Sequence, residues 1–452
     1  MPWPFIQRSR LSLAGAFFLA PLRFTPIILL SPLLISQIRP SRVLGWTDSW
    51  KTDLDGREKL GPLLRQMCDR VSGFNQDREK LHVLVEMRWD AAQVALSTRS
   101  SQDRWRLWQK RLSATATAVG LLNDPDLDSQ LIPSAGAIRV RLDIEGVRSL
   151  ARHDLVVGLV LDEWVQARQP SPCSQALRSA RPAGWSVHGN PTGNPDSTPM
   201  IIGHLSSGIE NSSRFRIVSF RDFRNGRIFP YDDDGLGTFC ASLIADPATG
   251  LAPSVGLLVG KVTGVGGRAQ LSGLLCAMDW IASRTEDRPH LVFNSWSLVE
   301  DPSPSVRRLF ARSVESWAAL GIIGFFPAGD RGPETLDFPA SHPSVIGVGS
   351  HDGTGIPMAY ASRELVKWNA LPFWKPDIFA PGDSIQSFWP GNLSGVLSGS
   401  AIACALATAA ACRSWSLTGS ASMEVLLSRI SQVTRDGQCP VVIPPGRSAD
   451  SP

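Results

Sequence analysis

The sequence predicts a parallel α/β domain with helices on both faces of its sheet, preceded by a smaller α+β domain. Three observations support this fold class. The chain has 452 residues, which is long for a single domain. Its apolar fraction of 43% and charged fraction of 19% are those of a globular protein that buries a core. From residue 200 onward, apolar strands alternate with helical segments, which is typical of a parallel sheet covered on both faces.

The smaller domain is predicted over residues 81–165. Leu81–Arg88 alternates apolar and polar residues as a half-buried strand does, and Leu155–Leu161 is an apolar strand. The cluster Pro133–Gly136 favours a turn between two more strands. Helical segments follow the first and third strands, so the order is βαββαβ, that of a ferredoxin-like sandwich. The remaining elements are the helices Ser101–Val119 and Glu145–Arg152 and the strands Gln130–Ile132 and Ala137–Asp143.

The larger domain is predicted over residues 200–433, with a loose tail at 434–452. Its strands are short and apolar, and its helices carry apolar residues at helical spacing. The expected strands are Met200–Leu205, Val255–Val262, His290–Phe293, Ile322–Pro327 and Ser344–Gly349. Thr238–Ile244 is expected to start the first helix. The other expected helices are Ala269–Arg284, Ser303–Leu320, Ser400–Ser414 and Met423–Val433.

Polar segments separate these parts. Residues 46–80 are charged and predict a linker with a helix around Leu60–Arg70. Residues 166–199 are rich in Pro, Ser, Gly and Asn, a composition that buries too little apolar surface to order itself. We therefore expect a second linker there.

The N-terminal residues 1–45 predict a targeting segment. Arg8 and Arg10 precede the apolar stretch Leu11–Leu22, which is the order of a secretory signal peptide. A second apolar stretch, Phe24–Ile38, follows, and residues 11–38 together reach the roughly 20 apolar residues that span a bilayer. We expect export to the periplasm or the extracellular space, and the sequence leaves open whether the segment is removed or stays as a membrane anchor.

Charge and cysteine content exclude some classes of protein. The net charge is only +4 and there is no dense Lys/Arg block, so nothing favours nucleic-acid binding. No Cys/His spacing resembles a zinc site. Cysteines within helical patterns are expected to be small buried apolar residues, and a disulfide among the others is left open. The first group is Cys240, Cys276, Cys404 and Cys412, and the second is Cys68, Cys173 and Cys439.

Three short segments of the larger domain carry the strongest functional signal: Leu205–Glu210 (LSSGIE), Gly235–Ala241 (GLGTFCA) and Gly399–Ala403 (GSAIA). They resemble the catalytic segments of the subtilisin-like serine proteases (subtilases), which place Asp-Ser-Gly after a strand, then His-Gly-Thr-His, then Gly-Thr-Ser-Met-Ala. The resemblance implies a subtilase fold over residues 200–433 and a propeptide-inhibitor-like domain over residues 81–165. Further motifs in family order are Leu251–Pro253, Gly260–Val262, Asn294–Trp296, Pro327–Pro333, Phe338–Ala340, Pro343–Gly349 and Lys375–Gly382.

The same resemblance assigns the triad positions to residues without triad chemistry. The aspartate position is Ser206, the histidine position is Leu236 and the nucleophile position is Ala401. A serine protease needs a carboxylate, an imidazole base and a hydroxyl nucleophile. The asparagine of the oxyanion hole corresponds to Asp330, whose charge would repel a developing oxyanion. We therefore expect no catalytic residue at these positions.

Neighbouring residues offer few replacements. Ser400 precedes Ala401, but its side chain is expected to leave the helix in another direction. His204 shares a strand face with Ser206, one step deeper, and is predicted to be buried and hydrogen-bonded. The run Asp232–Asp234 predicts a solvated loop or a helix cap, with weak calcium binding left open. No other cofactor is expected.

Two classes of function follow. The first is an exported pseudoprotease that binds an extended peptide as an added strand, or that serves as a structural protein. The second is a serine endopeptidase that retains proteolysis through displaced residues. The propeptide-like domain is expected to remain attached in cis, because Leu236 and Ala401 cannot cut the linker. Tethering holds the domain at a high effective concentration, at which it would cover the peptide-binding cleft.

Overall fold

The structure is a computed structural model that describes residues 56–70, 80–88, 101–167, 170–172, 200–253, 255–298, 302–368 and 371–416, together with 423, 426 and 427. Several predicted segments lie outside the described residues. They are the N-terminal segment 1–45, most of the linker 166–199, most of the helix Met423–Val433 and the tail 434–452.

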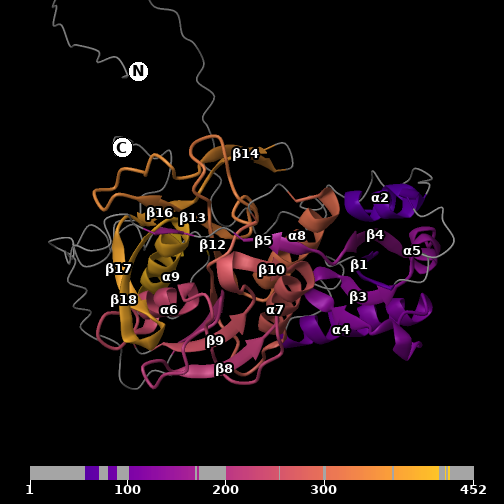
Figure 1. The fold of residues 1–452 in the computed structure, drawn as a ribbon, viewed down its shortest axis with the longest axis horizontal. Coiled ribbons are helices and arrows are strands. Elements are labelled where there is room, and N and C mark those ends of the chain that lie inside the picture. The colour runs from indigo at the N-terminus through magenta and orange to yellow at the C-terminus, as the bar shows by residue number, and fades with distance from the viewer. Residues whose placement is uncertain are drawn as a thin grey trace, which may run out of the picture. The chain divides into compact units, whose positions relative to one another are not determined.

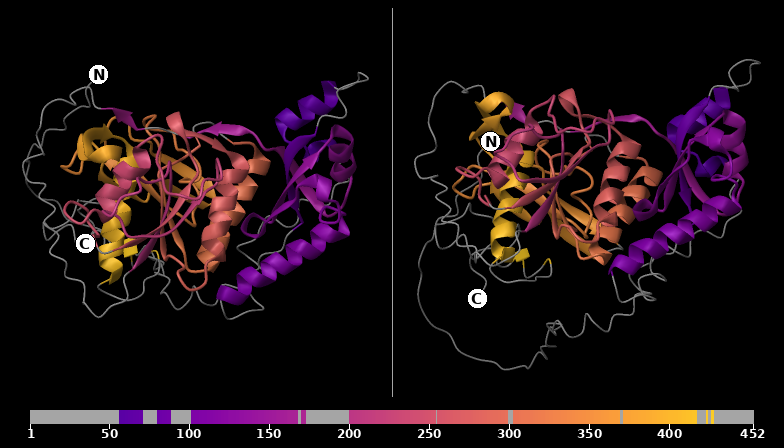
Figure 2. Two further views of the ribbon diagram at one scale, coloured as in Figure 1. Left: turned by 60° about the horizontal axis from the view of Figure 1, so that its bottom comes forward. Right: turned by 90° about the horizontal axis from the view of Figure 1, so that it is seen from below.

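The N-terminal part of the described chain forms a four-stranded antiparallel sheet in the order β2-β3-β1-β4, drawn in indigo to purple in Figures 1 and 2. This is the predicted βαββαβ arrangement. Asp143 fixes the start of one helix, because its side chain accepts a hydrogen bond of 2.7 Å from Gly146 N. The elements are η2 (Gly56–Lys59), α2 (Pro62–Arg70), β1 (Leu81–Met87), α4 (Ser101–Ala118), η3 (Pro125–Leu127), β2 (Gln130–Ile132), η4 (Pro133–Ala135), β3 (Ala137–Leu142), α5 (Ile144–Ala151) and β4 (Val156–Leu161).

Both faces of this small sheet are buried. Val83 and Val85 of β1 pack in one core cluster with the helices α4 and α5. Leu64 of α2 belongs to the same cluster, so the ordered structure begins before residue 81. Leu84, which points the other way, belongs to the cluster that surrounds α7 and α8 of the larger domain. The alternation along β1 therefore joins the two parts through apolar contacts.

The larger part contains a seven-stranded sheet in the order β16-β13-β12-β11-β7-β9-β8, in which all described pairs are parallel (Figure 1). This confirms the predicted fold class. The strands are β7 (Ile201–Ser206), β8 (Ile217–Asp222), β9 (Gly256–Lys261), β11 (Leu291–Asn294), β12 (Ile323–Pro327), β13 (Ile346–His351) and β16 (Ile378–Pro381). The helices are α6 (Leu236–Ala245), α7 (Leu271–Ser283), α8 (Pro304–Ala319) and α9 (Ser400–Ser416).

Helices cover both faces of this sheet. Phe293 of β11 lies in the cluster formed with α6 and α9. The neighbouring Val292 lies in the cluster formed with α7 and α8. Strands buried on both faces need nearly continuous apolar sequence, and β9 and β11 have such sequences.

Shorter strands flank the main sheet. β17 (Ile385–Trp389) and β18 (Leu393–Ser398) form an antiparallel sheet with β6 (Ser171–Pro172), next to η6 (Pro390–Asn392). β5 (Trp164–Gln166) pairs with β10 (Arg268–Gln270), which follows η5 (Val265–Gly267). β14 (Glu364–Trp368) and β15 (Leu371–Lys375) form a separate hairpin. None of these short strands was predicted from the sequence, and neither were the two edge strands of the main sheet, β8 and β16.

Candidate functional site

The elements that carry the three triad-like positions meet at the carboxyl end of the sheet. Ser206 is the last residue of β7, Leu236 is the first residue of α6, and Ala401 is the second residue of α9. All three are buried, with exposed fractions of 0%, 2% and 4%. Side chains that line a site in such a sheet are expected at this edge.

Specific contacts hold these elements together. The Gly237 amide at the start of α6 donates a 2.8 Å hydrogen bond to Ser207 Oγ, just beyond β7. A Cβ atom on Gly237 would lie 2.0 Å from Gly208 O, so only glycine permits this approach. On the α9 side, Cys404 Sγ lies 3.6 Å from Asn294 O at the end of β11. The segments found in the sequence are therefore neighbours in space.

The polar and apolar surroundings of the three positions differ from those of a catalytic centre. Ser206 Oγ forms a 2.7 Å hydrogen bond with Ser295 Oγ, an uncharged pair. Leu236 belongs to an apolar cluster that includes Phe239 and Ile402. Ala401 presents only a methyl group. No proton acceptor stands at the Leu236 position, and no hydroxyl stands at the Ala401 position.

The Asp330 carboxylate binds the first residue of α9. Its Oδ1 accepts a 2.9 Å hydrogen bond from Ser400 N, and its Oδ2 accepts one of 3.2 Å from Ser400 Oγ. Ser400 Oγ in turn accepts a 3.2 Å hydrogen bond from Gly329 N. A carboxylate is favoured there because a helix N-terminus carries partial positive charge. The Ser400 hydroxyl is thus engaged in the cap of α9.

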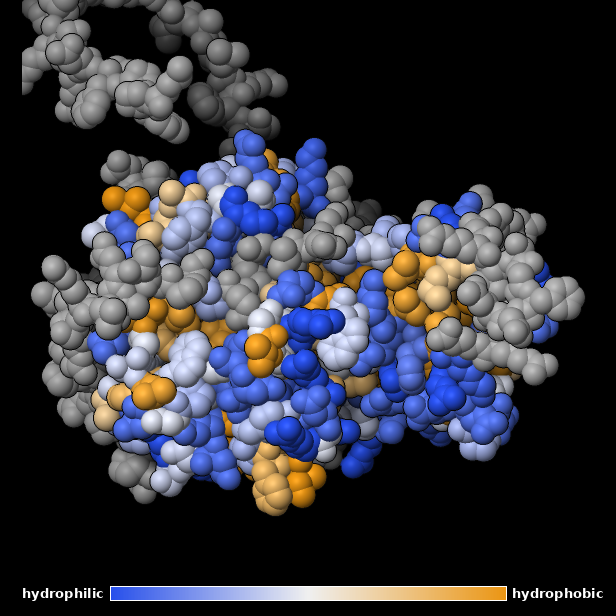
Figure 3. All heavy atoms as spheres, in the orientation of Figure 1, coloured by the Kyte–Doolittle hydropathy of each residue, from blue (hydrophilic) through white to orange (hydrophobic). Residues whose placement is uncertain are grey.

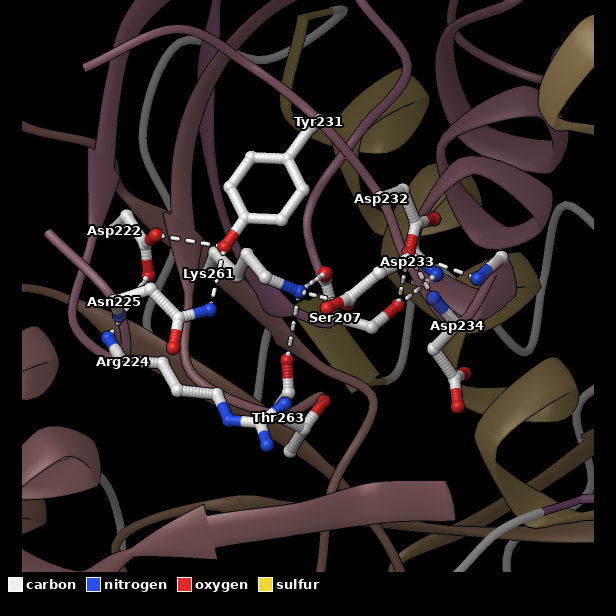
Figure 4. Close-up of polar contacts among 12 residues, drawn as sticks. Ser207, Asp222, Arg224, Asn225, Tyr231, Asp232, Asp233, Asp234, Lys261 and Thr263 are labelled. Carbon is white, nitrogen blue, oxygen red and sulfur yellow. Dashed lines mark hydrogen bonds and ion pairs between the residues drawn. The ribbon is translucent and has the colours of Figure 1, made fainter. Parts of the chain in front are cut away.

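Asp232 organises the start of α6, as Figure 4 shows. Its Oδ1 accepts hydrogen bonds from Ser207 Oγ and Gly235 N, both at 2.8 Å. Its Oδ2 accepts hydrogen bonds from the amide and the hydroxyl of Thr238, also at 2.8 Å. The acidic run was predicted to be a solvated loop or a helix cap; the N-cap residue of α6 is Gly235, and the Asp232 carboxylate accepts from the amide of Thr238 in the first turn.

Lys261 is a buried cation that sequence reasoning did not single out. Its side chain is fully buried at the end of β9, and Nζ lies 2.5 Å from Asp233 Oδ1 (Figure 4). Nζ also donates to Ser207 O and, at 3.0 Å, to Thr263 O. A buried ammonium needs such partners because it has lost its hydration. Apart from the Lys-Val motif, nothing in the apolar sequence around Lys261 predicted that its ammonium group would bind Asp233 and backbone carbonyls.

His204 lies beneath this network and is fully buried. Its ring packs 5.2 Å from the ring of Phe293, and neither ring nitrogen has a hydrogen-bond partner. The prediction of a hydrogen-bonded histidine was therefore wrong in that respect. Burial lowers the pKa of His204 to about 4, although Asp232 and the backbone of Gly237 and Gly208 act in the opposite direction. The ring is neutral at neutral pH.

The chain that follows the N-terminal domain runs beside these positions. Val165 pairs with Ala269 between β5 and β10, and Ala167 forms an antiparallel bridge to Leu298. Beyond residues 168–169, β6 pairs with Leu397 and Ser398 of β18. A Cβ atom on Gly399 would lie 3.4 Å from the Cα of Pro170. The chain thus lies next to the residues that precede Ala401.

The described residues contain neither a metal cluster nor a membrane-spanning helix. Within the described residues, no three His, Cys, Asp or Glu side chains gather as a metal site. None of the helices that the structure describes is long and apolar enough to cross a membrane. Cys240, Cys276 and Cys404 are free thiols, while Cys173 and Cys439 lie outside the described residues.

Sequence comparisons point to one class of protein, the subtilisin-like serine proteases. The alkaline serine protease ver112 of Corniculantispora psalliotae is 31% identical over 175 residues, or 38% of this chain and 42% of that protein. Serine protease AprX of Bacillus subtilis (strain 168) is 30% identical over 203 residues, or 39% of this chain and 44% of that protein. Subtilisin BL of Lederbergia lenta is 26% identical over 204 residues, or 44% of this chain and 70% of that protein.

The chain is thus similar in sequence to several subtilisin-like serine proteases. It spans less than half the length of the first two of these relatives. No protein-family model matches the chain. The crystal structure of a cold adapted subtilisin-like serine proteinase aligns with a TM-score of 0.43 and 21% identity over 50% of this chain and 80% of that one.

Proposed function

We propose that the chain is a catalytically inactive member of the subtilase family, exported from the cell, that acts by binding or as a structural protein. The observation that carries this proposal is the residue set at the converging edge: Ser206, Leu236 and Ala401. None of them supplies a carboxylate, a base or a hydroxyl nucleophile in its triad role. In subtilisin, loss of the nucleophile or the base lowers turnover about a million-fold.

The Asp330 contacts support the same proposal. A substrate carbonyl that is attacked by a nucleophile becomes an oxyanion, which needs hydrogen-bond donors. At this edge the Asp330 carboxylate accepts hydrogen bonds from Ser400 N and Ser400 Oγ. It adds negative charge where an asparagine amide would donate. Restoring a nucleophile alone would therefore leave the charge distribution unsuited to acyl transfer.

The pairing of residues 164–172 affects whether a free extended peptide could bind as a partner. An extended peptide partner would be added as a strand along an exposed backbone edge. The described edges at Arg268–Gln270 and at Leu298 are already paired with Trp164–Gln166 and Ala167. This favours occupation in cis by the segment after the propeptide-like domain. We therefore favour a structural role, or binding through other surfaces, over capture of a free peptide.

The alternative is a serine-type endopeptidase that works through displaced residues. Ser207 is a hydroxyl close to a carboxylate here, since Ser207 Oγ donates to Asp232 Oδ1 at 2.8 Å. However, the same oxygen accepts the Gly237 amide, and neither nitrogen of His204 has a hydrogen-bond partner. A nucleophile needs a base within hydrogen-bond reach. This geometry disfavours the alternative.

A serine-directed fluorophosphonate probe tests the proposal. The wild-type chain should remain unlabelled, because no activated hydroxyl is expected. The Ala401→Ser variant should also remain unlabelled and should not cleave peptide substrates, since base, orienting group and oxyanion donor are still missing. An active subtilisin labelled in parallel is the positive control. Labelling of the wild type that maps to Ser207, with peptide cleavage abolished by the probe, would establish the endopeptidase instead.

A further inference from the structure

An exposed surface beside β8 combines apolar side chains with arginines. Ile228 and Phe229 are 79% and 70% exposed in the loop after β8. Trp164 of β5 is 49% exposed, and its ring lies between two guanidinium groups: Arg224 at 5.6 Å and Arg268 at 5.5 Å. We call Trp164, Arg224, Arg227, Ile228, Phe229 and Arg268 the arginine–apolar surface. Figure 3 shows apolar side chains projecting at the lower edge of the molecule, near β8, among hydrophilic ones.

The loop that presents Ile228 and Phe229 is held in place by buried polar contacts. Asp222, at the end of β8, is buried and accepts hydrogen bonds from the amides of Arg224 (2.9 Å), Asn225 (3.0 Å) and Arg227 (3.1 Å). The Tyr231 hydroxyl donates to the same carboxylate at 2.8 Å and accepts from Asn225 Nδ2 at 2.8 Å (Figure 4). Several backbone hydrogen bonds to the carboxylate also lower the pKa of Asp222. The two apolar side chains are therefore exposed by an ordered loop.

The arginines link this loop to the neighbouring turn. A Cβ atom on Gly264 would lie 0.9 Å from Arg224 Nη1, so the Arg224 guanidinium covers the backbone of Gly264. Val265, directly after it, is 63% exposed. The Arg227 guanidinium lies 4.5 Å from the centre of the Tyr231 ring. The apolar tip, the arginines and the exposed Trp164 thus form one connected surface.

The charged members of the arginine–apolar surface are all arginines, and Glu163 beside Trp164 is partly buried. Between residues 222 and 230, Asp222 is the single carboxylate, and it is buried. The nearby Asp233 is paired with Lys261, and Asp234 Oδ2 accepts a 2.9 Å hydrogen bond from Gly266 N. Arg221, Arg227 and Arg268 are exposed. An apolar tip flanked by arginines matches an anionic bilayer, whose acyl chains take apolar side chains while its headgroups attract cations.

We propose that the arginine–apolar surface docks on an anionic lipid bilayer. Ile228 and Phe229 enter the interface between headgroups and acyl chains, Trp164 lies at headgroup depth, and the arginines bind lipid phosphates. The predicted targeting segment 11–38 is consistent with a chain that works at a membrane. This inference does not depend on whether the protein hydrolyses peptides, so its failure and the failure of the proposed function are separate results.

The first experiment measures hydrogen–deuterium exchange of the full chain with vesicles. Vesicles of phosphatidylcholine with phosphatidylglycerol should slow exchange in peptides that cover residues 223–231 and 264–268. Vesicles of phosphatidylcholine alone should protect them much less, because they lack the anionic headgroups that attract the arginines. Local exchange is the readout because the apolar N-terminal segment can itself bind vesicles. Unchanged exchange at residues 223–231 on anionic vesicles would overturn the proposal.

Variants then separate this surface from exposed apolar residues in general. The double variant Ile228→Ser/Phe229→Ser should lose the local protection and bind anionic vesicles about tenfold or more weakly. The matched control is Ile356→Ser/Leu393→Ser, which removes two apolar residues that are 65% and 64% exposed elsewhere, and it should behave as the wild type. Equal effects of the two double variants would contradict the proposal.

A photoreactive residue at position 229 identifies the occupant directly. In full chains isolated with host membranes, benzoylphenylalanine in place of Phe229 should form adducts with lipid on irradiation. Adducts with one protein and none with lipid would show that a protein, and not a bilayer, contacts this surface, and would overturn the inference.

Discussion

At the scale of single residues, polar groups at the carboxyl edge of the sheet serve to hold the fold. Asp232 accepts hydrogen bonds from five donors, including Ser207 Oγ and Thr238 N. Lys261 Nζ satisfies the carbonyls of Ser207 and Thr263 while paired with Asp233. For the acidic run before α6 the sequence left a solvated loop or a cap open, and it did not predict that the Asp232 carboxylate binds the amide of Thr238. It did not predict the Lys261 contacts with Ser207 and Asp233, since these join residues far apart in the chain.

His204 should make the protein less stable in acid. Its pKa is about 4 in the folded state and 6.5 for an ordinary histidine. Between these pH values the unfolded state binds the extra proton, so the free energy of unfolding decreases as the pH falls from about 6.5 to 4. The difference in pKa corresponds to a loss of about 3 kcal/mol by the lower end of that range.

Urea unfolding at pH 7.5 and pH 4.5 measures this effect. The wild type should lose more stability between the two pH values than the His204→Phe variant, by about 2–3 kcal/mol. Phenylalanine has no titrating group and suits a site that already packs against Phe293. An equal loss in both proteins would show that other groups cause the acid sensitivity.

At the scale of elements, the sequence predicted long periodic segments better than short strands. The helices α4, α7 and α8 and the strands β7, β9 and β11 were found because their apolar periodicity is clear. β17 and β18 were missed because they are five and six residues long and only partly buried. β6 has two residues in a Pro- and Ser-rich stretch, and its pairing depends on β18 more than 200 positions later. Such pairing cannot be read from local composition.

The contact between β1 and α8 should contribute strongly to stability. Glu86 of β1 is fully buried and lies 2.8 Å from Arg308 Nη2 and 3.2 Å from Arg312 Nη2. Glu86→Ala leaves two partly buried guanidinium groups without their carboxylate, which typically costs about 3–5 kcal/mol. Asp128→Asn is the control, because Asp128 is 67% exposed, its 3.6 Å pair with Arg139 should matter little, and asparagine tolerates its positive φ of 48°.

Thermal and urea unfolding of both variants test this prediction. A lower midpoint for Glu86→Ala and an almost unchanged midpoint for Asp128→Asn are expected. Similar midpoints for the two variants would indicate that water reaches the Arg308 and Arg312 side chains once Glu86 is gone.

At the scale of the whole molecule, the order of elements was predictable and the course of the connecting chain was not. The family motifs gave the parallel sheet, and the βαββαβ order gave the N-terminal sheet. The sequence described residues 166–199 as a linker because of their composition. Parts of this segment nevertheless form strand pairs: Ala167 pairs with Leu298, and β6 pairs with β18. These pairs form because the larger domain offers unpaired strand edges there. Composition carries no information about such edges.

The chain should therefore persist in one piece from the N-terminal domain to the end of the larger domain. In active subtilases the enzyme cuts itself free of its propeptide, and a site with Leu236 and Ala401 should not make that cut. Residues 164–167 and 170–172 then stay paired beside the site, since a tethered segment acts at a concentration of around millimolar. Intact-mass measurement on protein from the native host should give one chain that contains Leu81 through Val433. Two chains split within residues 166–199, appearing also in purified protein free of other proteases, would mean that the site still cuts, and the inactive assignment would fail with it.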